Sequence, residues 1–136
     1  MRKFVLGLAA LAVLGCGGDS TGPSASAVGT WSLQTINGSS LPLTVAFLAS
    51  PLYRLEVVSD TYVVSANGTY TEAYTSRETN GSTITTQTDT DNGTWTQNNN
   101  AITLTDSDDG SVVTATISGD IITANLSGVV FIYERQ

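Results

Sequence analysis

Residues 111–135 read SVVTATISGDIITANLSGVVFIYER, and this stretch decides the fold. Apolar and polar residues alternate along 113–118, which places the apolar side chains on one face of an extended strand. Gly119-Asp120 and Ser127-Gly128 divide the stretch into three such runs, and both pairs suit the positive φ angles of tight hairpin turns. Three short strands joined by tight turns indicate an antiparallel meander.

The same pattern continues upstream to residue 30, with further turns predicted at Asn67-Gly68, Asn80-Gly81, Asn92-Gly93 and Asp109-Gly110. The predicted strands are residues 30–36, 53–58, 61–65, 69–78, 83–88, 94–97, 101–105, 111–118, 121–126 and 129–135. We therefore predict an all-β fold, an antiparallel up-and-down meander closed into a barrel of about 8–10 strands, because closure removes the exposed edges of the sheet. An open sandwich of two sheets is the alternative.

Residues 38–51, GSSLPLTVAFLASP, interrupt this rhythm because they are apolar, uncharged and carry two prolines. One interpretation is an extra strand or a plug packed against one end of the barrel. The other is a lid over the mouth of a cavity. Apolar loop residues usually serve burial, which favours packing.

The composition excludes several classes of function. The chain has a net charge of −7 and no histidine, and beyond Cys16 its only basic residues are Arg54, Arg77 and Arg135. Such a surface repels phosphate backbones, so nucleic acid is not expected as a partner. Cys16 is the single cysteine, so the fold has no internal disulfide.

The N-terminal residues predict export and lipid attachment. Residues 1–15 combine the basic pair Arg2-Lys3 with a short apolar stretch, as a signal peptide does. Val13-Leu14-Gly15-Cys16 resembles the lipobox of bacterial lipoproteins, which implies that Cys16 carries a fatty acyl (palmitate) anchor. Residues 16–27 are then a flexible tether and residues 28–136 the barrel domain. We expect a lipid-anchored protein of the cell envelope, at the outer membrane where the host has one; ordinary secretion after Ala27 is the alternative.

The first and last predicted strands carry a family resemblance. Gly29-Thr30-Trp31 begins the first strand, and Arg135 ends the last one. Gly93-Thr94-Trp95-Thr96 is a further segment that carries the resemblance. The chain resembles the lipocalins of the calycin superfamily, in particular small bacterial lipocalin-like lipoproteins. The resemblance implies that Gly29, Trp31 and Arg135 close one end of the barrel, with the guanidinium stacked on the indole.

Five aromatic residues are candidates for a binding site inside the barrel. At strand positions their rings could form apolar walls with polar groups, suited to a small hydrophobic ligand. These residues are Tyr53, Tyr62, Tyr70, Tyr74 and Trp95. The alternative is that they fill a narrow core, because a barrel of about eight strands is either packed solid or holds one ligand.

We expect no enzymatic activity, no catalytic residues, no cofactor and no metal. Without histidine, and without a lysine beyond residue 3, a nucleophile has no ordinary base. The acidic run 105–111 could suggest calcium, but a solvated hairpin turn explains it more simply. The sequence thus predicts a lipid-anchored envelope protein whose barrel binds a small hydrophobic ligand. The alternative is a structural or interaction lipoprotein with a filled barrel and no ligand.

Overall fold

The computed structural model describes residues 25–136, and all regular structure among them is β. The strands are β1 (Gly29–Ile36), β2 (Ser39–Ser40), β3 (Leu43–Ala49), β4 (Leu52–Val64), β5 (Thr69–Asn80), β6 (Thr83–Asn98), β7 (Ala101–Asp106), β8 (Val112–Ser118), β9 (Ile121–Leu126) and β10 (Val129–Arg135). Within this part of the chain no helix has the length and apolar character to cross a membrane. The predicted signal peptide, Cys16 and most of the predicted tether lie outside the described residues.

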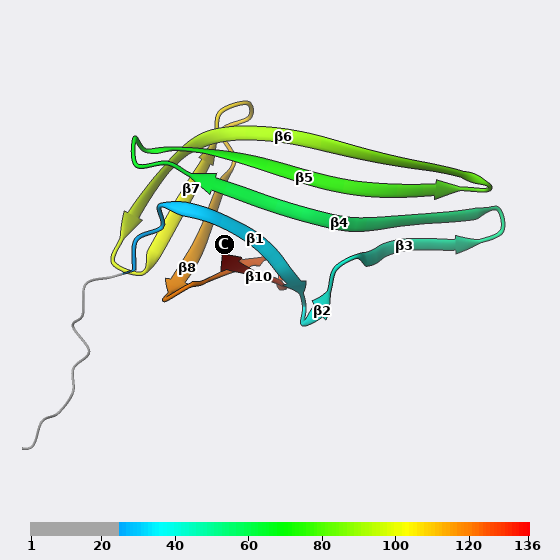
Figure 1. The fold of residues 1–136 in the computed structure, drawn as a ribbon, viewed down its shortest axis with the longest axis horizontal. Coiled ribbons are helices and arrows are strands. Elements are labelled where there is room, and N and C mark those ends of the chain that lie inside the picture. The colour runs from blue at the N-terminus through cyan, green and yellow to red at the C-terminus, as the bar shows by residue number, and fades with distance from the viewer. Residues whose placement is uncertain (1–24) are drawn as a thin grey trace, which may run out of the picture.

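Eight of the strands form a closed ring (Figure 1). Each strand from β4 to β10 pairs antiparallel with the next one in sequence, β10 pairs with β1, and β1 pairs with β4. The pairing between Gly29 and Val64 at one end of β1 and β4 completes the cylinder. The predicted all-β meander closed into a barrel is therefore confirmed, and the open sandwich is excluded.

Two pairs of predicted strands are joined into single long strands. β4 contains both predicted strands, 53–58 and 61–65, and its pairing with β5 shifts register between Val57 and Ser59. β6 continues through Asn92-Gly93, so the turn predicted there is wrong. Gly93 serves a different purpose, because a Cβ at this position would overlap the carbonyl oxygen of Thr105 and lie 2.6 Å from the Tyr70 ring. It is needed for close approach between strands and not for a turn.

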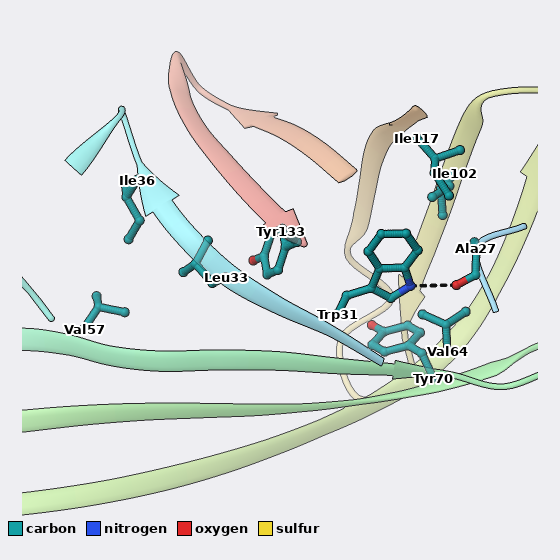
Figure 2. Packing of buried hydrophobic residues seen from close by; sticks show 10 residues of the cluster. All are labelled: Ala27, Trp31, Leu33, Ile36, Val57, Val64, Tyr70, Ile102, Ile117 and Tyr133. Carbon is teal, nitrogen blue, oxygen red and sulfur yellow. Dashed lines mark hydrogen bonds between the residues drawn. The ribbon is translucent and has the colours of Figure 1, made fainter. Parts of the chain in front are cut away.

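The core lies within the ring (Figure 2). Trp31, Ile102 and Ile117 are its largest fully buried side chains, contributed by β1, β7 and β8. Each of them lies between two less buried residues of its strand, as the period of two in extended chains requires. Tyr70 and Tyr133 complete the apolar cluster from the opposite walls.

The outer halves of three strands continue beyond the ring as a projecting sheet, which we call the arm (Figure 1). It consists of β3 together with residues 52–57 of β4, 75–80 of β5 and 83–88 of β6. Every residue of β6 from Thr83 to Asn92 is exposed, as is β3 after Leu43. The apolar segment 38–51 thus does supply the extra strand. Leu41 and Leu43 of this segment pack against the core, and the side chains after Leu43 are exposed. The segment is not a lid, since it lines neither of the two cavities described below.

Candidate functional site

Arg135 seals one end of the barrel. Its guanidinium carbon lies 4.2 Å from the centroid of the Trp31 ring. Its Nη1 and Nη2 atoms donate to the carbonyl oxygens of Val28, at 2.7 Å, and Ser26, at 2.6 Å, and its Nε donates to Asp120 at 2.9 Å. The planar guanidinium suits this arrangement because it offers donors in several fixed directions at once.

Gly29 allows the arginine to reach this position. It has a φ of 145°, and a Cβ there would lie 2.6 Å from Nη1 of Arg135. The structure therefore brings together the three residues that the family resemblance placed at the closed end, and it supplies a steric reason for the glycine.

Residues 25–27, assigned to the flexible tether from sequence, are packed against this end. Ala27 is fully buried, and its carbonyl oxygen accepts a hydrogen bond of 2.7 Å from Nε1 of Trp31 (Figure 2). The side chain of Gln97 accepts from the Ala27 N–H and donates to the Ala25 carbonyl. Residues 25–27 therefore pack on the domain predicted to begin at residue 28, because a buried indole N–H requires an acceptor.

Two connected cavities occupy the other part of the barrel. An inner cavity of about 50 Å³ rests on Trp31 and has almost entirely apolar walls, including Ile102 and Ile122. An outer cavity of about 290 Å³ opens beside the β7–β8 connection. Tyr62, Leu104 and Val113 border both, so the two cavities adjoin. We call the outer cavity the mouth and the inner one the slot.

A family model of the lipocalin-like domain matches residues 28–125, which is more than half of the chain. The chain belongs to the lipocalin-like family. No curated protein matches it.

Buried carboxylates distinguish the interior of this lipocalin-like barrel. Asp60 on β4 is only 6% exposed; its Oδ2 accepts a 2.7 Å hydrogen bond from the hydroxyl of Tyr133, whereas Oδ1 has no partner. The carboxyl group of Glu72 on β5 lies near that of Asp60 and also borders the mouth. Burial raises the pKa of Asp60. Burial, followed by the nearby carboxylate of Asp60, raises the pKa of Glu72 to about 7, because two adjacent carboxylates do not ionise together easily.

Tyrosine rings surround this pair of carboxylates. The Tyr62 ring lies 5.7 Å from that of Tyr70 and 5.5 Å from that of Tyr133, measured between centroids, the latter pair edge to face. Burial raises the pKa of Tyr62 and Tyr133 well above the usual range, so both hydroxyls stay protonated and can donate hydrogen bonds. The interior therefore combines aromatic faces with carboxyl oxygens.

The rim of the mouth is acidic as well. Asp106 lines it from the end of β7, Asp108 and Asp109 from the β7–β8 connection, and Asp91 from β6. Hydrogen bonds within the β7–β8 connection stabilise its conformation, because Oδ1 of Asp106 accepts from the backbone N–H groups of Asp108 and Asp109. Among the described residues, no three acidic side chains are grouped closely enough to hold a metal ion.

The five predicted aromatics have different positions. Tyr62 and Tyr70 line the mouth, and Tyr62 also lines the slot. Tyr74 packs against the core without lining either cavity, and Tyr53 lies in the arm. Trp95 donates from Nε1 to the carbonyl of Ser65, in the turn between β4 and β5, and it too borders neither cavity.

Sequence reasoning missed the residues that give the cavity its chemistry: Asp60, Glu72, Asp91 and Tyr133. A signal was present for two of them. Asp60 shares strand parity with Tyr62 and Val64, and Glu72 shares it with Tyr70 and Tyr74, so both face inward. The sequence does not indicate where along the barrel axis the packed core ends and the cavity begins.

Proposed function

We propose that this protein is a lipid-anchored envelope protein whose barrel binds a small amphiphilic ligand at its open end. The observation that carries the proposal is the mouth of about 290 Å³ adjoining the apolar slot of about 50 Å³. The mouth approaches the size of known small-molecule sites, which begin at roughly 300 Å³. The slot has room for a short apolar group and not for a long acyl chain.

The anchor is part of the proposal and rests on the sequence around Cys16. Eight residues, 17–24, separate Cys16 from the first described residue, so the two Cα atoms can be at most about 32 Å apart. The chain enters the barrel beside Trp31 and Arg135, at the end opposite the mouth. An anchor at Cys16 would therefore hold the sealed end towards the membrane and leave the mouth facing away from it.

Native mass spectrometry of the protein purified from its host tests the binding function. We expect a species heavier than the protein alone, which loses a small molecule on gentle activation. A protein that is always bare, and that takes up none of a panel of small amphiphiles added afterwards, would overturn the binding role. The anchor is tested separately by the mass of the N-terminal peptide and by comparison with Cys16→Ser, which should leave the membrane fraction.

One observation favours a second role, in which the protein acts by contacting another envelope component. The arm exposes Val45, Phe47 and Leu48 at 51%, 60% and 59%, although such side chains normally seek burial. A photo-crosslinking residue in place of Phe47 should then give one discrete product in cells, and the same residue at exposed Thr94 should not. Absence of any product specific to Phe47 would remove this role.

A further inference from the structure

The open end of the barrel has carboxylates and no cation. Of the residues that border the mouth and the slot, none is basic. Arg54 and Arg77 lie in the arm and pair with Glu56, at 3.5 and 2.8 Å. Arg135 is bound at the sealed end to Asp120. Since these three are the only cations beyond residue 3, nothing at the mouth could balance the carboxylate of a fatty acid.

The interior also holds an acceptor that lacks a donor. Oδ1 of Asp60 is buried and unpartnered, on the inward face of β4 and next to Glu72, which opens to the mouth. A buried carboxylate oxygen without a hydrogen bond is costly, so a proton or a cationic donor is favoured beside it. The neighbouring Tyr62 and Tyr70 rings add faces that attract positive charge.

The residues around the mouth and the slot indicate which kind of cation could bind there. A bare divalent metal ion is not suited, because the described carboxylates do not form a group of three ligands. An ammonium group is suited, since it needs only two or three acceptors and can place an attached apolar group in the slot, past Leu104 and Val113.

We propose that the ligand is a small amphiphilic amine, with its ammonium group bound between Glu72 and Asp60 near the acidic rim and its short apolar part in the slot. This inference rests on the proposed binding function and names the chemical class of its ligand. It predicts that the barrel discriminates by the charge of the head group and not only by the apolar part.

The protonation of the carboxylate pair supports a further consequence. The ammonium takes the place of the proton that the pair holds, so amine binding releases that proton and strengthens as pH rises through the range in which Glu72 titrates, around pH 7. The titratable groups that face the pair contribute no positive charge. They are Tyr62 from β4, Tyr70 and Tyr74 from β5, Asp91 from β6, Asp106 from β7 and Tyr133 from β10.

The test is an NMR titration of residues 17–136, which include every described residue, with hexylamine, 1-hexanol and hexanoate at about pH 8. We expect hexylamine to bind at least about tenfold more tightly than 1-hexanol, and hexanoate most weakly, since charge-assisted hydrogen bonds are the strong ones. Hexylamine affinity should fall between about pH 8 and pH 6, while that of 1-hexanol should not change.

Variants locate the charge effect. Glu72→Gln should weaken hexylamine binding about tenfold and leave 1-hexanol binding unchanged. Asp91→Asn should weaken hexylamine binding less than Glu72→Gln does. Asp91 is exposed on the rim, so this substitution should leave the fold unchanged. Glu134→Gln, on the exposed outer surface of β10, makes the same charge change away from the mouth and should have no effect.

The outcomes distinguish a failure of the amine proposal from a failure of the proposed binding function. Equal binding of the three probes, or tightest binding of hexanoate, would overturn the amine class and leave the binding site standing. The same holds if Glu72→Gln and Asp91→Asn both bind hexylamine as the wild type does. Failure of all three probes to shift any resonance of a residue bordering the mouth would overturn the inference together with the binding function.

Discussion

Replacing Arg135 with lysine should strongly destabilise the barrel, although it preserves the charge. Arg135 donates to two backbone carbonyls and to Asp120 while its guanidinium covers the Trp31 ring. A lysine ammonium cannot reach these acceptors from one position, so at least two of the hydrogen bonds are lost. Each bond from a charged donor contributes about 1.5–3 kcal/mol when fully formed. The Arg135 side chain is 26% exposed and water partly replaces it, so we expect a total loss of about 2–4 kcal/mol.

Urea unfolding followed by tryptophan fluorescence measures this loss. The matched control is Arg77→Lys, because Arg77 has a single acidic partner, Glu56 in the arm, which a lysine ammonium can also pair with. An Arg135→Lys protein that unfolds within about 0.5 kcal/mol of the wild type would refute the argument that the fork of donors closes the barrel.

Three further predictions concern other parts of the barrel. Gly93→Ala should cost more than about 2 kcal/mol in urea unfolding, because its methyl group would overlap the Thr105 carbonyl between paired strands. A chain beginning at Val28 should be less stable by about 1–3 kcal/mol than one beginning at Ala25, and its tryptophan emission should shift to the red, since the Trp31 indole loses its acceptor. The wild type should lose stability between about pH 5 and pH 8, by roughly 1–2 kcal/mol after solvent screening, and Glu72→Gln should lose much less.

The sign of the pH effect follows from the proton balance. The pKa of Glu72 is raised in the folded state, so between the ordinary glutamate pKa of 4.5 and about 7 the folded protein holds more protons than the unfolded chain. Stability conferred by the protonated form is therefore complete at low pH and is lost as pH rises through 7. A rise in stability over that interval would contradict the burial of the carboxylate pair.

Controls for these variants are available on the same strands. Thr94→Ala, next to Gly93 and exposed, should change stability little, and Glu78→Gln in the arm should keep the pH dependence of the wild type. A Gly93→Ala protein as stable as Thr94→Ala would show that the strands can separate to admit the methyl group. Equal stability of the two N-terminal truncations would show that the Ala27 carbonyl is not needed.

The architecture was predictable because strand alternation and glycine-rich turns are local signals. Ser127-Gly128 at the β9–β10 turn is one of these, and both residues adopt positive φ. Asn92-Gly93 has the same composition but lies inside a strand, since Gly93 is required by a side chain 23 positions away in sequence, that of Tyr70. A local pattern cannot distinguish a glycine needed for a turn from a glycine needed for a distant neighbour.

The cavity was less predictable than the fold. Period-two alternation places Tyr62, Tyr70 and Tyr74 on the inward face, but it does not indicate how far along the barrel each one lies. The β4 strand is much longer than the barrel requires, which carries Tyr53 into the arm. Asp60 was overlooked because a buried carboxylate is uncommon and becomes plausible only when Tyr133 and Glu72 are seen beside it.

The arm and the ring share strands, and only the base of the arm, at Val57 and Leu43, packs against the core. The strand pairings that close the ring involve residues 61–64 of β4, whereas the arm begins before the irregularity at Val57 and Ser59. Amide hydrogens in the outer half of β6 should therefore exchange with solvent through local opening, long before those beside Ile102 and Ile117, which require global unfolding. The same independence would let the hairpins of the arm lengthen or shorten during evolution without disturbing the closed cylinder.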